Sequence, residues 1–436
     1  MVKTNIYIYL TTIIMSSVIP CFSFASSFTV SKVEVPAKVG RSNIGLFNSP
    51  IFTFNDDVYV AYVSDNDDGT HSTFVAKYED NNWIKAIVEP LTMNNQYHAQ
   101  ASIALDVHGY IHVTYNMHSS PWQYSVSKKP EDLSAWVFKG QSLNGPHNVK
   151  KSAVVTGKGT ASIPGNRISY HYMATDIYGN LFISYREALK LSQRIKYGDR
   201  QWSLGISKYD VNTMTWNRVG AKDTTLPFVS EPGYRPQVGH MSFDKLNRLH
   251  VSWNWYVEYS LNGSKKPNVI SYAYSDDGGK SFLDAYGEPL SLPISRAGSD
   301  KIIDEDFYLS YTKVAGTSTG LPIVSIMPKP PSKKNRSLII FHNETGWSKN
   351  ISLPYGATDF YIDNDDSIIA ISSGLRIHKS SDYGKTWETS ELDVVQGPYI
   401  YWIDRAYTLK TGNLRFLAQG KKNNKLIVYT IDFNGS

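Results

Sequence analysis

A strand–turn–strand pattern recurs along this chain and limits the folds that it can adopt. In each copy a strand leads into a turn with Asp, Asn or Gly, and an apolar strand follows; the copies lie at 54–62, 105–115, 169–187, 243–253, 320–325, 362–370 and 412–417. The copies are about 45 to 70 residues apart, a period typical of propellers. One copy buries little surface alone and gains its core by stacking on its neighbours. The sequence therefore predicts an all-β, seven-bladed β-propeller.

Two Asp boxes support this prediction. Residues 275–282 and 380–387 match the pattern Ser-x-Asp-x-Gly-x-Thr-Trp, the first of them with Ser and Phe at the last two positions. In this motif Asp and Gly form a hairpin turn, and the final aromatic side chain packs between blades. Because such hairpins occur in propellers of many functions, they indicate the fold and not the activity.

The two ends of the chain are expected to meet in the last blade. Residues 28–35 alternate at period two and could pair beside residues 426–429. A blade built from both ends leaves no exposed sheet edge at the closure. No linker or low-complexity segment indicates a second domain, so we predict one catalytic propeller domain over residues 26–436.

Residues 1–25 have the features of a secretory signal peptide. Lys3 precedes an apolar run over 6–24, and small residues follow. A membrane anchor fits less well because Pro20 interrupts the run, and Pro20 also replaces the small residue expected before a lipoprotein cysteine. We expect secretion, with no stable membrane insertion after cleavage. Cys21 is the only cysteine, so the mature chain would hold no disulfide and no thiolate ligand.

Composition adds a weak indication of carbohydrate. The chain has 30 Tyr and 10 Trp, and amphipathic rings stack on sugars, although strands are rich in Tyr in any case. A net charge of +5 is compatible with an anionic glycan as partner. We expect no nucleic-acid partner and a monomer.

Four side chains suited to catalysis converge at the ends of two hairpins, away from the turns. Folding residues 169–187 about the turn places Tyr170 roughly opposite Arg186, and folding the preceding hairpin places His98 opposite His118. Two His, one Tyr and one Arg suit β-elimination on a uronic acid. The Arg offsets the carboxylate charge, a neutral His can take the C5 proton, and the Tyr can donate to the departing oxygen or act as the base.

The next hairpin adds polar and aromatic side chains at the same end. It contributes Tyr234, Arg235, Gln237 and His240 on one strand and Trp253, Asn254 and Trp255 on the other. The predicted substrate-binding residues are Tyr172, Tyr234, Arg235, Gln237, Asn254 and Trp253.

Each candidate also has a structural interpretation. Tyr170 could be ordinary packing, and Tyr172, on the same strand face, competes for its role. Arg186 could pair with Glu187, and the two predicted catalytic histidines could bind a metal together. His171 is expected on the opposite strand face in a structural role.

At these positions the sequence resembles the propeller-type ulvan lyases, especially polysaccharide lyase family 25, with family 24 as a more distant relative. The resemblance covers essentially the whole mature chain and rests on the seven repeats and on residues 97–100 (YHAQ), 115–118 (YNMH), 166–172 (NRISYHY) and 184–187 (SYRE). It implies endolytic cleavage of ulvan, a sulfated rhamnose–uronic acid polysaccharide of green algae, leaving a 4,5-unsaturated uronate.

The resemblance also implies residue roles. His98 and Tyr170 would form the base and acid pair, with either assignment open, Arg186 would neutralise the carboxylate, and His118 would be a second active-site histidine. Members of the family can carry a structural zinc with Cys among its ligands. Without a mature Cys, His240 and His250 are candidates for a remnant of that site. A structural zinc or calcium ion stays open, and catalysis requires no cofactor.

Two other functions remain open. The Asp boxes suggest a sialidase-like glycoside hydrolase, which needs three Arg around one carboxylate and a Tyr–Glu nucleophile, but the expected Arg-Ile-Pro motif near the mature N-terminus is absent. Hydrolysis also calls for paired carboxylates, and no such pair stands at the corresponding strand ends. A non-catalytic glycan-binding propeller would share the aromatic side chains without needing His98 or Tyr170.

Overall fold

The computed structural model describes most of the chain from Phe28 onward. The described residues are 28–37, 39, 47–90, 92, 100–141, 167–195, 198–220, 226–231, 234–256, 268–305, 309–328, 337–343, 345–348, 351–354, 356–392, 399–420 and 424–433. His98 and the predicted signal peptide lie outside them.

The described residues form seven antiparallel sheets. The first holds β2 (Ile51–Phe54), β3 (Asp57–Asp65), β4 (His71–Glu79) and β5 (Asn82–Glu89). The second holds β6 (Ser102–Leu105), β7 (Ile111–Thr114), β9 (Tyr124–Ser127) and β10 (Trp136–Phe138). The third holds β8 (His118–Ser120), β11 (Ile168–Thr175), β12 (Leu181–Ile195), β13 (Gly198–Asp210) and β14 (Thr215–Arg218). The fourth holds β15 (Arg235–Phe243), β16 (Leu249–Tyr256), β17 (Asn268–Ser275), β18 (Phe282–Leu283), β19 (Pro289–Leu290) and β20 (Asp300–Glu305).

The remaining sheets complete the chain. The fifth holds β21 (Leu309–Gly316), β22 (Pro322–Pro328), β23 (Leu338–Asn343), β24 (Gly346–Trp347) and β25 (Ile351–Ser352). The sixth holds β26 (Ala357–Ile362), β27 (Ile368–Ser372), β28 (Arg376–Ser380) and β29 (Glu388–Glu391). The seventh holds β30 (Tyr399–Ile403), β31 (Leu414–Gly420), β32 (Leu426–Asp432) and β1 (Thr29–Glu34).

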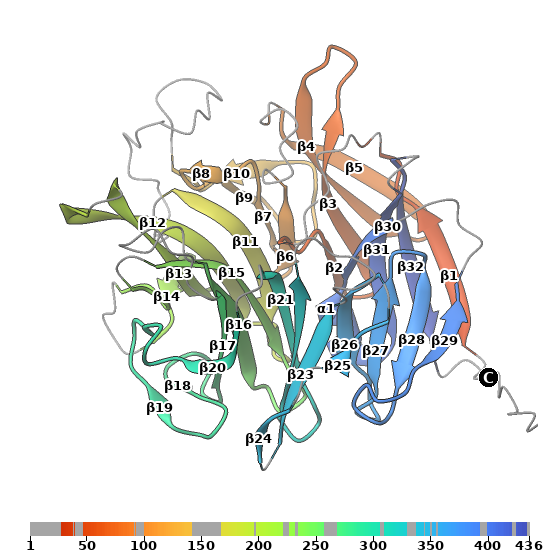
Figure 1. Cartoon of the computed structure of the whole chain (residues 1–436). Coiled ribbons are helices and arrows are strands. Elements are labelled where there is room, and N and C mark those ends of the chain that lie inside the picture. The colour runs from red at the N-terminus through yellow and green to blue at the C-terminus, as the bar shows by residue number, and fades with distance from the viewer. Residues whose placement is uncertain are drawn as a thin grey trace, which may run out of the picture.

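These sheets pack face to face around one axis, so the chain is a β-propeller (Figure 1). The innermost strands contact one another in chain order: β2, β6, β11, β15, β21, β26 and β30. Apolar clusters fill the seams; one of them joins Val60 of the first sheet to Trp402 and Leu417 of the seventh. Stacking of sheets thus supplies the core, as the repeats predict.

The predicted turn chemistry recurs in four hairpins. Asp106, Asp176, Asp244 and Asp363 each accept two backbone N–H groups through Oδ1, from the residues two and four positions further on. The residue three positions on has a positive φ in each case; it is Gly at 109 and 179, Asn at 247 and Asp at 366. Such local bonds specify a turn without help from the rest of the fold.

The chain ends meet as predicted. β1 pairs antiparallel with β32, with Val33 opposite Val428, and Figure 1 shows the red β1 beside the blue β32. Lys425 also donates to Glu34 across this pair. The seventh sheet is therefore built from both ends of the chain.

The seventh hairpin departs from the predicted pattern, because a short helix replaces the tight turn. α1 (Arg405–Thr411) begins after Asp404, whose side chain accepts the N–H of Tyr407, and it ends at Gly412 with φ 75°. These are the caps that helices favour. α1 packs on β2, β11 and β31, and so lies at the turn end of the axis. No helix in the described ranges is long and apolar enough to span a membrane.

Both Asp boxes form the expected hairpins. In the first, Asp277 accepts from the backbone of Lys280 and Ser281, and Phe282 is buried against Phe228. In the second, Asp382 accepts from Thr386, and Trp387 packs on an apolar cluster that joins the fifth and sixth sheets.

Register irregularities interrupt four neighbouring innermost strands at or before their middle. The register shifts between Ser169 and Tyr172 in β11, and comparable shifts occur in β15, β21 and β26. A bulge redirects side chains relative to the regular alternation of a strand. In β11 it directs His171 into the seam between sheets, where Thr114 Oγ1 lies 2.7 Å from its Nδ1.

Buried His171 predicts an acid-sensitive stability. Burial lowers its pKa to about 3, whereas an unfolded chain protonates histidine near pH 6.5. Between these values the unfolded state binds one more proton, so the free energy of unfolding falls as pH drops from about 6.5 toward about 3, by up to about 1.4 kcal/mol per pH unit for this residue. Urea titrations of His171→Asn between pH 4 and pH 7 should show a shallower pH dependence than the native protein.

Exposed His108 provides the matched control. His108→Asn should keep the native pH dependence, since this side chain lies at an exposed turn. If the free energy of unfolding of His171→Asn varied with pH as steeply as that of the native protein, His171 would not be the source of the acid sensitivity.

Candidate active site

The bulge in β11 presents Tyr170 at the end of the third hairpin away from the turn. Tyr170 has φ 55°, which is rare for an aromatic residue and costs roughly 1 kcal/mol or more. Because of the bulge, Ser169 and not Tyr170 is in register with Arg186. The prediction placed Tyr170 roughly opposite Arg186; the register is displaced by one residue, and the two side chains meet.

Arg186 lies against two aromatic rings. Its Cζ is 4.3 Å from the ring centroid of Tyr170 and 4.3 Å from that of Trp202. Both distances are within cation–π range. Arg186 is 4% exposed, so water screens its charge weakly. Of the two tyrosines that compete for the catalytic role, the one beside Arg186 is Tyr170.

The neighbouring Glu187 points away from this site. It is fully buried and receives both guanidinium nitrogens of Arg218, at 2.7 and 2.8 Å. The alternation of β12 therefore separates the two side chains. The alternative in which Arg186 serves only to pair with Glu187 is wrong.

His118 reaches the site from the second hairpin. It lies on β8, which leaves the second sheet and pairs with β11, placing His118 opposite Ser169. Its ring centroid is 6.4 Å from that of Tyr170. Phe47 covers the Tyr170 ring at 4.4 Å and also contacts Tyr311. Three of the four predicted catalytic residues thus lie together; the fourth, His98, is outside the described residues.

Aromatic and guanidinium groups continue from this cluster onto the fourth sheet. Arg235 lies over the ring of Trp202 at 5.3 Å, and Arg296 lies over the ring of Tyr234 at 5.2 Å. The cluster also contains four residues that were not predicted from the sequence: Phe47, Trp202, Arg296 and Tyr311. The signal for Trp202 was its place in the strand after the candidate hairpin, two positions from the residue that pairs with Arg186.

Not every predicted substrate-binding residue belongs here. Trp253 has no exposed surface and packs in the core against Phe228, because β16 directs alternate side chains into the seam; it is removed from the set. Tyr172 lies deeper in the propeller, with its ring against His240 and under Lys313. Gln237 is half-buried and in register with buried Asn254.

The two histidines considered as a metal remnant have separate surroundings. His250 Nε2 lies 3.0 Å from Asp244 and its Nδ1 lies 2.7 Å from the Tyr272 hydroxyl, so both ring nitrogens are engaged. His240 Nδ1 accepts the N–H of Val314, and burial and the charge of Lys313 lower the pKa of His240. Among the described residues no group of three or more His, Cys, Asp or Glu side chains is placed to hold a metal.

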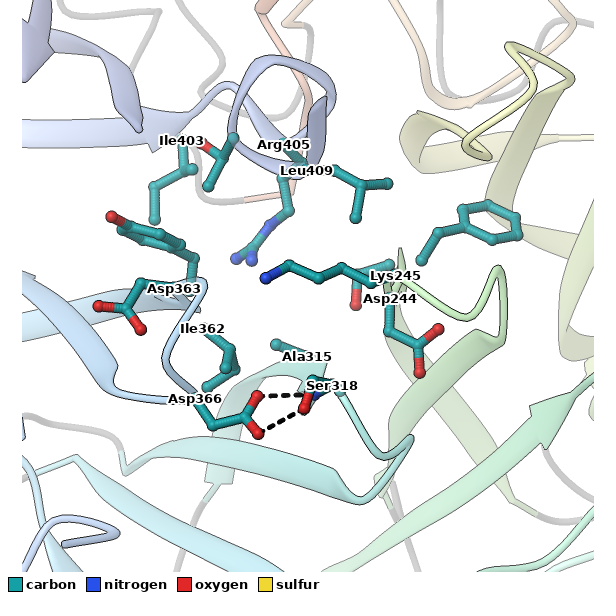
Figure 2. Close-up of a pocket in the computed structure, with 15 residues that line it drawn as sticks. Asp244, Lys245, Ala315, Ser318, Ile362, Asp363, Asp366, Ile403, Arg405 and Leu409 are labelled. Carbon is teal, nitrogen blue, oxygen red and sulfur yellow. Dashed lines mark hydrogen bonds between the residues drawn. The ribbon is translucent and has the colours of Figure 1, made fainter. Parts of the chain in front are cut away.

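A pocket at the opposite, turn end has a different character (Figure 2). Turns of the fourth, fifth and sixth sheets and α1 line it. Figure 2 shows Lys245 and Arg405 pointing into it and toward each other. Its acidic groups serve the fold, since Asp363 pairs with Lys379 and Asp366 accepts from Ser318. Tyr170, Arg186 and His118, the predicted catalytic residues that the structure describes, are not among its lining residues.

The fold and these side chains define a β-propeller with Asp-box hairpins and an aromatic, arginine-rich cluster at the end away from its turns. The family described as "BNR repeat-containing family member" matches residues 57–352. The chain therefore belongs to the BNR repeat-containing family.

Solved structures share the fold over nearly the whole chain. The polysaccharide lyase Uly1 superposes with a TM-score of 0.65 at 13% identity, covering 90% of this chain and 91% of that one. A family 25 ulvan lyase bound to -[GlcA(1-4)Rha3S]- gives 0.66 at 14% identity, with 93% and 97% covered. The recognised resemblance to propeller-type ulvan lyases is thus confirmed in the fold. No curated protein matches this chain in sequence.

The Glu187–Arg218 pair predicts a large loss of stability on breaking one partner. Arg218→Met leaves a buried carboxylate uncompensated, which costs about 3–5 kcal/mol. The double variant Glu187→Gln with Arg218→Met should recover most of that loss. Urea denaturation of the native protein and both variants measures the free energy of unfolding. Equal stability of the single and double variants would contradict the pairing of Glu187 with Arg218.

Proposed function

We propose that the chain is a secreted polysaccharide lyase that cleaves ulvan endolytically by β-elimination. The observation that carries the proposal is the position of Arg186, a buried cation against Tyr170 with His118 beside the same ring. A cation, a phenol and an imidazole at one site are the groups that proton abstraction next to a carboxylate requires. The fold shared with ulvan lyases supports the choice of reaction class.

Arg186 would act on the uronate carboxylate. Its guanidinium is planar and held against two rings, so it can meet a carboxylate with two parallel hydrogen bonds. Neutralising the carboxylate stabilises the charge that develops when the C5 proton leaves. Weak screening at this buried position strengthens the effect.

Tyr170 and His98 would move the protons. One takes the C5 proton, the C4–O bond breaks as the C4=C5 double bond forms, and the departing glycosidic oxygen receives a proton from the other. We leave the assignment of base and acid open, because glucuronate and iduronate present the C5 proton on opposite faces. His118 would support the substrate or the base beside Tyr170. No step needs a cofactor.

The aromatic and guanidinium groups on the fourth sheet would hold neighbouring sugar units. Trp202 and Tyr234 offer rings, and Arg235 and Arg296 offer charge for sulfate or carboxylate groups. Gln237 and Asn254 would add polar contacts at the same strand level. This arrangement suits a substrate that is anionic at every repeat.

The proposal includes the organisation of the chain. Each of the seven sheets would be one blade, and residues 26–436 would form one domain, supported by the pairing of β1 with β32. Residues 1–25 would direct secretion and be removed. The protein would act as a monomer.

A sialidase-like hydrolase is the second candidate. Arg186 and Arg235 lie over the Trp202 ring and Arg296 lies over the Tyr234 ring, and these would be the three arginines of such a site; Glu231 accepts the backbone N–H of Arg296. Against it, no described residue pairs Glu231 with a tyrosine side chain in a nucleophile arrangement, whereas Tyr170 contacts Arg186. In a propeller that only binds glycans, the unfavourable backbone conformation of Tyr170 would have no functional role.

The first test follows ultraviolet absorbance of the unsaturated uronate while purified protein acts on ulvan. The native protein should give a rise, and Tyr170→Phe should lower kcat by about 10²–10⁴-fold, because the transferable phenolic proton is lost. Tyr178→Phe is the matched control, since Tyr178 is 71% exposed at a turn, and it should retain native rates.

Other outcomes identify the alternatives. New reducing ends without the absorbance rise would indicate a hydrolase. Neither signal, with binding retained, would indicate a glycan-binding propeller.

Arg186→Lys separates charge from geometry. Lysine keeps the charge but loses the planar fork and the ring contacts, so kcat/KM on ulvan should fall by about 10–100-fold. The same change at exposed Arg376, which pairs with Glu391, should have no effect. Native kcat/KM for Arg186→Lys would contradict the role of Arg186.

A further inference from the structure

A cavity of about 210 Å³ lies between the second and third sheets, on the side of their turns. It is formed by the turn that starts at Asp106, by β9 and β10, and by the chain that leaves β13. The residues that line it are Asp106, His108, Tyr110, Tyr124, Val126, Ser127, Lys128, Val137, Lys139, Tyr209, Val211 and Met214. No residue of the candidate active site is among them.

The floor of this cavity is aromatic and rigid. The Tyr209 ring meets the His112 ring edge-on at 4.5 Å, and the Tyr124 hydroxyl lies 2.6 Å from His112 Nδ1. Tyr110 is half-buried at the side. At the lip, Val137 is 37% and Met214 57% exposed. Fixed rings beside exposed apolar atoms form a surface on which the C–H face of a sugar can pack.

The charge around the cavity favours an anion. Lys128 and Lys139 line it, and the backbone of each is fixed, by hydrogen bonds to Ala135 and Tyr124. The carboxylate among the described lining residues, that of Asp106, is used by the fold: Oδ1 accepts two turn N–H groups and Oδ2 lies 3.2 Å from His112 Nε2. Two lysines therefore line the cavity beside a carboxylate that is already hydrogen-bonded.

We propose that this cavity is a second binding site for an anionic sugar unit, distant from the reaction centre. Its ligand would be a uronate or sulfated sugar within the same polysaccharide chain, so the identity of the polymer rests on the proposed function. The ring of the sugar would pack against Tyr110 and the apolar lip, and its acid group would meet the two lysines. Such a site would hold the polymer near the enzyme without taking part in catalysis.

The test compares binding of ulvan by variants that share Tyr170→Phe, which is expected to slow turnover enough for binding to be measured. Adding Lys128→Ala and Lys139→Ala should weaken binding about tenfold, measured as Kd by titration calorimetry, because each exposed charge contact contributes up to about a factor of five. The matched control adds Lys280→Ala and Lys385→Ala, which remove the same charge from exposed Asp-box turns. The control should bind like the parent.

Each outcome decides the proposal. A loss confined to the Lys128/Lys139 variant supports the site. Equal binding by all three proteins overturns it, as does an equal loss in both lysine pairs, which would reflect net charge alone. Absence of any ulvan binding by the parent also overturns it. If the confined loss occurs while the native protein shows no eliminative cleavage, the second site stands and the proposed lyase activity fails.

Discussion

The irregularity in β11 is the local feature on which both the seam and the candidate site depend. One shift of register directs His171 into the contact between sheets and Tyr170 toward Arg186. In the seam, Asn48 donates to the His171 carbonyl at 3.2 Å and Ser102 donates to it at 2.9 Å, so this buried residue joins the second sheet, the third sheet and the segment that precedes β2. These bonds replace the strand pairing lost at the bulge, and they hold Tyr170 in a backbone conformation that it would not keep alone.

The alternation of side chains along β12 separates a charge that stabilises the fold from a charge that belongs to the candidate site. Along β12 the side chains of Arg186 and Glu187 face opposite sides of the sheet; Glu187 meets Arg218 in the interior, while Arg186 meets two rings at the end away from the turns. A buried ion pair must be matched to be tolerated. Arg186, on the other face, has its guanidinium against the rings of Tyr170 and Trp202.

Part of the candidate site could be predicted because it depends on local geometry. The Asp-to-Gly turn defines a hairpin, and a hairpin brings Tyr170 near Arg186 within one residue of error. The register error and the misplacement of Trp253 have related causes. The alternation of polar and apolar residues does not indicate a bulge. The sequence around a Trp near a strand end is also the same whether its side chain faces a ligand or the core, and Trp253 faces the core against Phe228. Arg296 was missed because it comes from a segment far along the chain from this hairpin, whereas Trp202 lies in the next strand, β13, and was overlooked.

The sequence by itself determined the repeat, the turns and the closure of the ring. Each depends on interactions between residues close in the chain, or on a period-two pattern that both chain ends display. The tertiary structure alone decided that α1 would replace the seventh turn, that β8 would cross to the third sheet with His118, and that Trp202 would lie against Arg186. Those outcomes depend on packing between sheets, where the partner of a side chain is set by the whole ring and not by its neighbours in sequence.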